Sequence, residues 1–212
     1  MKNENTKTII NAPIVSGGKL FWLFKRVSDI FISLLLLPIM VIIAIFIYFF
    51  NSITQSGKVF YFQNRMGLDC NSFVAIKFRT MSEIVSIERK FDDPVELNRI
   101  TRLGKILRQS RLDELPQIIN VLKGEMSLIG PRPDYYEHAV IFLEKIEEYR
   151  WRYNIKPGIS GLAQIRQGYT QGLDATRKKV NIDIYYIENV GFWLETKILL
   201  NTIITVFKRI GK

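Results

Sequence analysis

The stretch Ile30–Phe50, IFISLLLLPIMVIIAIFIYFF, contains no charged residue. A helix rises about 1.5 Å per residue, so a run of this length can cross a hydrocarbon core about 30 Å thick. No small-residue cleavage site follows the run before Asn51, so we do not expect it to be removed as a signal peptide. The stretch therefore predicts a membrane helix that stays in the mature protein.

Two features of this run favour a helix that enters the membrane and returns. Pro38 lies well inside it, where proline removes a backbone hydrogen bond and kinks the helix. Basic residues flank both ends: Lys19, Lys25 and Arg26 before it, Lys58 and Arg65 after it. A spanning helix should have more positive charge on its cytoplasmic side, whereas a re-entrant helix keeps both basic ends on one anionic surface. We therefore expect a re-entrant helix, broken at Pro38, ahead of a single span.

The overall charge also points to anionic partners. The 212 residues include 30 Lys and Arg against 20 Asp and Glu, a net charge of +10. This balance favours nucleic acid, an acidic lipid surface or phosphorylated small molecules, and does not choose among them. Asp29, beside Lys25 and Arg26, is expected to form an interfacial ion pair that fixes where the helix enters the membrane. A single cysteine, Cys70, excludes an internal disulfide.

The chain length predicts one domain with appendages, divided into three parts. Residues 1–18 are polar and are expected to form a mobile tail, residues 19–55 the membrane anchor, and residues 56–212 the remaining domain. We expect an α+β, mostly helical fold in which the re-entrant helix-break-helix precedes a small cytoplasmic domain. That domain is expected to combine a short β-hairpin with interfacial amphipathic helices.

Several segments of this domain have recognisable patterns. Two short apolar runs around a turn predict the hairpin, and residues 82–98 predict a loop. The Phe192–Ile210 segment ends in basic residues and predicts either an interfacial helix or a buried core helix. The predicted strands are Val59–Phe62 and Phe73–Phe78, and the other predicted helices are Ile100–Arg108, Leu115–Leu122 and Tyr135–Tyr153.

The hexapeptide LDELPQ at 112–117 places two carboxylates, Asp113 and Glu114, at a predicted helix start. Pro116 is tolerated only in the first turn, so the helix should begin near Asp113, which then fits the N-cap. Backbone N–H groups and the helix dipole favour the ionised carboxylate at an N-cap, and an ionised carboxylate can act as a nucleophile. Glu114 could help to hold Mg²⁺ with a diphosphate substrate. Taken alone, however, Asp-Glu at this position is also ordinary helix capping.

Basic side chains elsewhere supply candidates for binding phosphate. In Gly130-Pro131-Arg132-Pro133, the second proline disfavours helix at Arg132, so its guanidinium extends from a rigid turn. Lys77 and Arg79 are two residues apart and share one side if the segment is a strand; an exposed basic face is the alternative. Lys156 precedes a Pro-Gly turn, 156–161, that could lie against a nucleotide or simply turn the chain.

These motifs occur in an order that resembles the small monotopic phosphoglycosyl transferases, the bacterial sugar transferases. The resemblance extends from about Phe21 to the C-terminus. It departs from the family at Leu37, where a serine often precedes the proline, and at Leu162, where an aromatic residue is common. The motifs are Lys25-Arg26 before the apolar run, Gln63–Gly67, Lys77–Met81, Leu112–Gln117, Asn120–Ser127, Gly130–Pro133 and Lys156–Gly161.

The resemblance implies transfer of a sugar 1-phosphate from a UDP-sugar to a polyprenyl (undecaprenyl) phosphate, with release of UMP. It implies that Asp113 is the nucleophile of a covalent phosphosugar intermediate and that Glu114 is its partner, both near Mg²⁺. Arg132 would contact phosphate, with Lys77 and Arg79 as weaker candidates.

The resemblance also implies a location and a pathway. The reaction would occur at the cytoplasmic face of the bacterial inner membrane, on an anionic surface and without nucleic acid. It would be the first membrane step of glycoconjugate synthesis, such as that of O-antigen, capsule, exopolysaccharide or glycoprotein glycans. The competing interpretation is a single-span membrane protein with a basic, non-catalytic binding domain.

Overall fold

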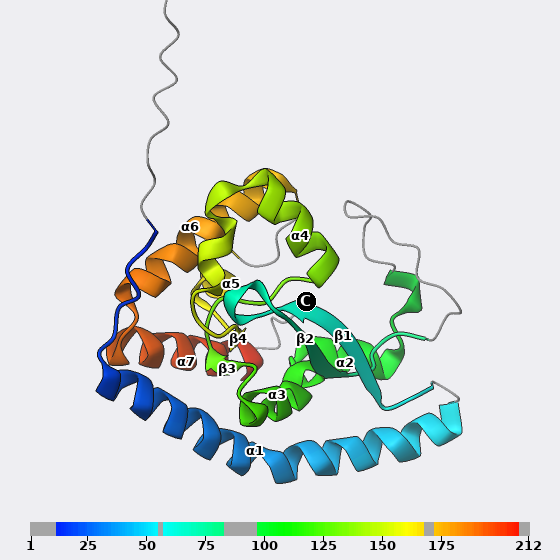
Figure 1. Cartoon of the computed structure of the whole chain (residues 1–212). Coiled ribbons are helices and arrows are strands. Elements are labelled where there is room, and N and C mark those ends of the chain that lie inside the picture. Colours follow the sequence, from blue (N-terminus) through cyan, green and yellow to red (C-terminus); the bar gives the residue numbers. More distant parts are fainter. Residues whose placement is uncertain (1–11, 55–56, 83–96, 168–171, 208–212) are drawn as a thin grey trace, which may run out of the picture.

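In the computed structural model, a long N-terminal helix, α1 (Lys19–Thr54), runs along one side of the rest of the chain (Figure 1). The structure describes residues 12–54, 57–82, 97–167 and 172–207. The first eleven residues of the predicted tail, and residues 83–96 of the loop predicted at 82–98, therefore lie outside the described residues. Helix predominates in the described part, and the sheets are small. This agrees with the predicted α+β, mostly helical class.

The long helix does not break at Pro38. Its 36 residues form one helix that contains Pro38, although its axis bends near the middle (Figure 1). Proline removes only one N–H donor, so hydrogen bonds on either side can carry the helix through the bend. Within the described ranges, α1 is the one helix long and apolar enough to cross a membrane. The predicted helix-break-helix is thus a single bent helix.

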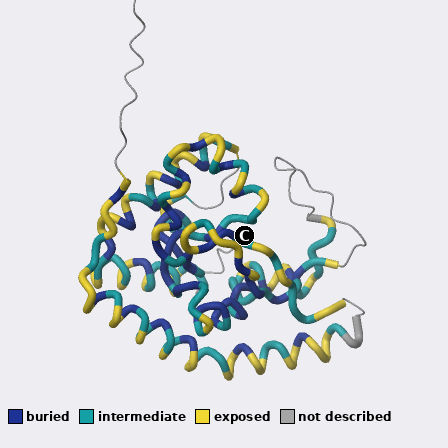
Figure 2. The backbone as a smooth tube through the Cα atoms, in the orientation of Figure 1, coloured by how far each residue is buried: buried dark blue, intermediate teal, exposed yellow. Residues whose placement is uncertain are grey.

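The two faces of α1 have opposite characters (Figure 2). The side toward the domain buries apolar residues together with three polar ones, Lys25, Asp29 and Ser33. The outer side exposes Leu, Ile, Val and Phe along its whole length. A helix on the surface of a soluble protein normally places polar residues outside. The outer face of α1 therefore requires an apolar environment.

Asp29 attaches α1 to the domain. Its carboxylate accepts hydrogen bonds from the Ser127 hydroxyl at 2.7 Å and from the Leu128 backbone N–H at 3.1 Å. The predicted ion pair between Asp29 and Lys25 or Arg26 is therefore wrong. The carboxylate is buried against a strand about 100 residues away in sequence, and the adjacent cations bind other groups.

The two cations provide further attachments. The Lys25 ammonium lies 2.6 Å from a carboxylate oxygen of Glu195, on the C-terminal helix. The Arg26 guanidinium donates to the backbone carbonyls of Val121 at 2.6 Å and Leu122 at 3.1 Å. Those carbonyls lie near the end of a helix, where the negative end of the helix dipole attracts cations. All three charged side chains in this part of α1 thus bind the domain.

The predicted hairpin is confirmed. Strands β1 (Phe60–Met66) and β2 (Ser72–Phe78) pair antiparallel, with the 3₁₀ turn η1 (Leu68–Cys70) between them. A second pair was not predicted: β3 (Ser127–Ile129) and β4 (Gly158–Ser160) run parallel, so the predicted 156–161 turn forms a strand. A Cβ on Gly158 would lie 2.1 Å from the backbone nitrogen of Gly130, so this pairing requires glycine.

The remaining helices pack above α1. The predicted helix Tyr135–Tyr153 is divided in two, because Ile146 is extended (φ −134°) and its side chain is buried in a cluster with Phe142 and Tyr149. Tertiary burial has here overridden local propensity. The elements are η2 (Leu97–Arg99), α2 (Arg102–Gln109), η3 (Leu112–Gln117), α3 (Ile118–Lys123), α4 (Tyr136–Lys145), η4 (Glu147–Tyr153), α5 (Leu162–Arg166), α6 (Leu173–Asn189) and α7 (Phe192–Phe207).

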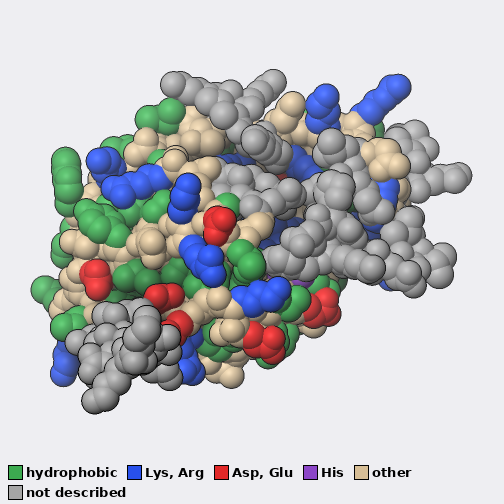
Figure 3. Space-filling view, turned by 90° about the horizontal axis from the view of Figure 1, so that it is seen from above, with side chains coloured by type: hydrophobic (Ala, Val, Ile, Leu, Met, Phe, Trp, Pro, Cys, Tyr) green, Lys and Arg blue, Asp and Glu red, His purple; other side chains and the backbone are tan. Residues whose placement is uncertain are grey.

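Helix α7 extends the apolar face of α1. The Phe192 ring packs edge-on against Phe21 and Phe24 of α1, with centroids 5.2 and 5.1 Å apart. Ile198 is buried on the inner side of α7, whereas Trp193 is 82% exposed on the outer side. The helix therefore has one face in the core and one exposed apolar face, and its interfacial character stays a prediction. Seen from above, on the side away from α1, the surface instead shows basic, acidic and apolar side chains interspersed (Figure 3).

We predict that Asp29→Ala lowers the free energy of unfolding by about 1–3 kcal/mol, because it leaves buried donors on Ser127 and Leu128 without their acceptor. Chemical denaturation in detergent micelles measures this loss. Asp174→Ala is the matched control, since Asp174 is 91% exposed and, among the described residues, pairs only with Arg177. Equal stability of the two variants would show that the Asp29 contacts do not hold α1 in place.

Candidate functional site

Glu114 lies at the centre of a compact charge cluster. Its side chain is buried, and Lys77 on β2 approaches one carboxylate oxygen to 2.7 Å. Arg132 contacts both oxygens, one of them at 2.9 Å. The three residues come from different elements: Lys77 from strand β2, Glu114 from the 3₁₀ turn η3 and Arg132 from the loop after β3. The structure thus unites three of the predicted site residues.

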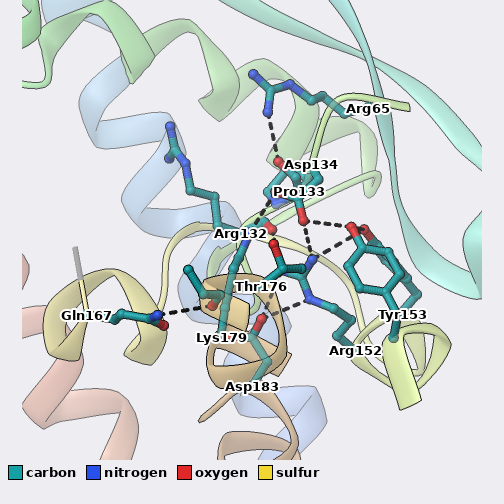
Figure 4. A network of polar contacts seen from close by, with 12 residues as sticks. Arg65, Arg132, Pro133, Asp134, Arg152, Tyr153, Gln167, Thr176, Lys179 and Asp183 are labelled. Carbon is teal, nitrogen blue, oxygen red and sulfur yellow. Dashed lines mark hydrogen bonds and ion pairs between the residues drawn. The ribbon is translucent and has the colours of Figure 1, made fainter. Parts of the chain in front are cut away.

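The backbone around Arg132 is held by two other arginines. Arg152 donates to the carbonyl of Arg132 at 2.8 Å, and Arg65 donates to the carbonyl of Pro133 at 2.9 Å. Figure 4 shows both contacts. The side chain of Arg132 points away from Arg152 and Asp183. The turn that its two prolines were predicted to make rigid is therefore also held by hydrogen bonds from Arg152 and Arg65. Its guanidinium is fixed before any ligand binds.

A buried polar network supports this turn (Figure 4). Arg152 is fully buried and binds the carboxylates of Asp134 and of Asp183, the latter at 2.8 Å. Lys179 and Tyr149 bind Asp134 at 2.6 and 2.7 Å. Removing one partner from such a network typically costs about 3–5 kcal/mol, because a buried charge is left uncompensated. Displacing the turn that carries Arg132 would break these contacts and is therefore energetically unfavourable.

Asp113 lies beside this cluster but is not an N-cap. It occupies the second position of η3, and Arg111 and Gln117 take the caps of η3 and α3. The predicted capping role is wrong because the helix begins with a 3₁₀ turn that already contains both carboxylates. Within the described residues the Asp113 carboxylate has no hydrogen bond or ion pair, so both of its oxygens remain open to a ligand.

The two neighbouring carboxylates differ electrostatically. Burial, and then the negative charge of Glu114, raise the pKa of Asp113 to about 6, while Lys77 and Arg132 oppose the rise. Burial also acts to raise the pKa of Glu114, but Arg132 and Lys77 outweigh it and hold that pKa well below its usual value. Glu114 is therefore a permanent anion that anchors cations. Asp113 is ionised at neutral pH but has a raised basicity.

The other predicted cations lie elsewhere. Arg79 donates to the backbone carbonyl of Lys58 at 3.1 Å and lies over the ring of Tyr61, on the hairpin. Lys156 lies beside Arg26 and the end of α3. Of the four predicted phosphate-binding cations, the structure brings only Lys77 and Arg132 to the dyad.

Two arginines that the sequence reasoning did not select lie near the dyad. Arg108, on α2, lowers the pKa of Asp113 and donates to the Thr80 hydroxyl at 2.9 Å. Arg111, with a left-handed backbone (φ 55°), precedes η3, and burial and the charge of Arg132 lower its pKa. Their spacing from Asp113, five and two residues, was the only sequence signal, and basic residues before a helix are common.

The dyad fits a magnesium ion of the kind that diphosphate substrates bring. Mg²⁺ is usually held by one or two carboxylates together with substrate phosphates and waters. In the described part of the chain nothing engages the oxygens of Asp113, and Glu114 retains acceptor capacity beyond its two cation contacts. Within the described residues no group of three or more His, Cys, Asp or Glu side chains could hold a metal by itself. The protein would thus supply part of the coordination and the substrate the rest.

Comparisons with known proteins identify the family of the chain. The model of the family described as bacterial sugar transferase matches residues 20–209. A UDP-N-acetylgalactosamine-undecaprenyl-phosphate N-acetylgalactosaminephosphotransferase of Aeromonas hydrophila is 38% identical over 88% of this chain and 44% of its own length. A UDP-glucose:undecaprenyl-phosphate glucose-1-phosphate transferase of Klebsiella pneumoniae is 38% identical over 87% and 40%.

The lengths of these relatives differ from that of the chain. The chain spans less than half of the two proteins above. An exopolysaccharide production protein of Rhizobium leguminosarum, PSS, is 33% identical over 87% of this chain and 96% of its own length. The shared region therefore corresponds to part of some relatives and to nearly the whole of another.

We predict that the pKa of Asp113 is about 6 and falls in Glu114→Gln, because the substitution removes the negative charge that helps to raise it. Carboxyl ¹³C NMR titration of protein labelled at aspartate measures both values in micelles. Asp174→Asn, which removes an exposed carboxylate, should leave the pKa of Asp113 unchanged. A pKa near the ordinary aspartate value in the unaltered protein would contradict this account of the dyad.

Proposed function

Because the chain belongs to the bacterial sugar transferase family, we propose that it transfers a sugar 1-phosphate from a UDP-sugar to undecaprenyl phosphate. The products are UMP and undecaprenyl-diphosphate-sugar, which begins a glycoconjugate such as an exopolysaccharide. One observation carries the proposal. The Asp113 carboxylate, which has no partner among the described residues and has a raised pKa, lies beside a carboxylate that holds two cations.

The reaction follows from these roles in two displacements. An Asp113 oxygen attacks the phosphorus that bears the sugar, and the bond from that phosphorus to the oxygen of UMP breaks. UMP leaves with the bonding electrons, and an aspartyl-phosphosugar remains on the enzyme. An oxygen of undecaprenyl phosphate then attacks the same phosphorus, and the Asp113 carboxylate is released.

The electrostatics of the site suit both steps. A pKa of about 6 leaves Asp113 largely ionised at pH 7, while its partial burial removes water that would weaken it as a nucleophile. Lys77 and Arg132 are placed to neutralise charge on the transferred phosphoryl group. Glu114 holds these cations in position. The acceptor is already an anion, so no general base is required.

We further propose that Asp113 and Glu114 help to hold Mg²⁺ carried by the diphosphate. When bound, the ion would offset negative charge on the diphosphate and on the departing UMP. The protein groups keep their own roles in this arrangement. Arg132 and Lys77 fix the position of Glu114, and Asp113 presents its free oxygens to the substrate.

The two faces of α1 support a membrane arrangement for this chemistry. The helix contacts the domain near its start through Phe21, in the middle through Asp29 and toward its end through Ile47. A helix bound to one domain at both ends cannot place those ends on opposite sides of a bilayer. We propose that α1 lies re-entrant in the cytoplasmic leaflet of the inner membrane, with its apolar outer face in lipid.

We predict that Asp113→Asn abolishes both UMP release and the covalent intermediate, because an amide cannot replace the carboxylate nucleophile. Purified protein with UDP-sugars in turn, without undecaprenyl phosphate, should release at most about one UMP per enzyme and gain the mass of a phosphosugar. Adding undecaprenyl phosphate should then allow turnover.

Asp174→Asn is the control and should behave as the unaltered protein. Retained transfer in Asp113→Asn would assign the nucleophile elsewhere. No UMP from any UDP-sugar, in protein that is folded, would favour a non-catalytic binding domain.

A further inference from the structure

Two cations outside the dyad cluster converge on one point beside Gly124. This glycine ends α3 with a left-handed backbone (φ 86°). A Cβ placed on it would lie 3.6 Å from the Arg26 guanidinium and 3.6 Å from the Lys156 ammonium. The two nitrogen atoms are therefore no farther apart than twice that distance. The glycine leaves the space between them free of a side chain.

The positive charge at this point is only partly balanced by the protein. Arg26 donates to backbone carbonyls, which are uncharged. The nearby carboxylate of Asp29, which accepts hydrogen bonds from the neutral donors Ser127 and Leu128, offsets only one of the two positive charges. Lys156 is half-buried, and among the described residues its ammonium forms no hydrogen bond and no ion pair. Two like charges held together in this way attract an anion.

This cation pair is separate from the dyad. Burial and Arg26 lower the pKa of Lys156, and Asp29 raises it, whereas neither Asp113 nor Glu114 is among the charges that act on it. The charges that act on Lys156 are therefore those of α1 rather than those of the dyad.

We propose that Arg26 and Lys156 form a binding site for the phosphate of an anionic membrane phospholipid, which anchors the enzyme and does not react. Arg26 binds the domain through the carbonyls of Val121 and Leu122, so the site lies on the domain side of α1, about one helix diameter from the apolar outer face. If that outer face lies in the acyl chains, the domain side lies at the depth of the headgroups. This proposal rests on the membrane arrangement proposed above.

The chemistry of the site favours a phospholipid phosphate over the acceptor phosphate. The acceptor must bring its phosphate to the phosphorus on Asp113, whereas this site belongs to α1 and the end of α3. The net charge of +10 already favours anionic lipid as the surrounding surface. A phosphate held between two cations adds a defined contact to that general attraction.

The test measures lipid binding to the full chain in detergent micelles by native mass spectrometry. Phosphatidylglycerol, phosphatidylcholine and undecaprenyl phosphate are titrated separately. The variants are Lys156→Gln and Lys156→Met, which remove the charge, Lys156→Arg, which keeps it, and Lys178→Gln, a control at an exposed lysine on α6. Circular dichroism verifies that each variant is folded, and either neutral variant suffices for the comparison.

We expect the neutral variants to bind phosphatidylglycerol about fivefold more weakly, equivalent to about 1 kcal/mol for one cation at the membrane surface. Lys156→Arg and Lys178→Gln should bind it normally. Unchanged binding in the neutral variants, or an equal loss in Lys178→Gln, would overturn the proposal. A loss confined to undecaprenyl phosphate would assign the site to the acceptor and also overturn it. Sugar transfer is not measured here, so failure would leave the proposed function standing.

Discussion

The structure depends on one constraint: three charged side chains that an apolar helix directs toward the domain must find their partners there. Lys25 binds Glu195, Arg26 binds the carbonyls at the end of α3, and Asp29 binds Ser127 and the backbone of β3. Facing lipid, these groups would lose several kcal/mol each. In the proposed membrane arrangement, this orientation presents the apolar outer face to lipid and fixes the domain against the membrane.

The same contacts connect the membrane helix to the chemistry. Asp29 holds the start of β3, and the loop after β3 carries Arg132, whose guanidinium binds Glu114. The buried network around Arg152 holds that loop from the other side. Glu114 is thereby fixed between two cations, and its charge contributes to the raised pKa of its neighbour Asp113. The reactivity proposed for Asp113 is thus a product of burial and of contacts distant in sequence.

Local sequence patterns correctly predicted the structural features that depend on residues close together in the chain. Apolar runs around a turn gave the hairpin, and Pro116 correctly restricted the dyad to the first turn of a helical segment. The errors arose where distant segments decide. Asp29 pairs with Ser127 rather than with adjacent cations, and β4 becomes a strand because β3 lies beside it. Burial of Ile146 likewise interrupts a helix that its sequence alone would continue. Burial, which the sequence does not specify, also reversed the expected effect on the pKa of Asp113.

The central claim is that both ends of α1 lie on the side of the membrane where the domain lies. Single cysteines at positions 19 and 58, in a Cys70→Ser background, test it with a maleimide that cannot cross the membrane. The account predicts that neither cysteine is labelled in intact cells and that both are labelled after lysis. Labelling of one position in intact cells and of the other only after lysis would show that α1 spans the membrane, and would contradict the account.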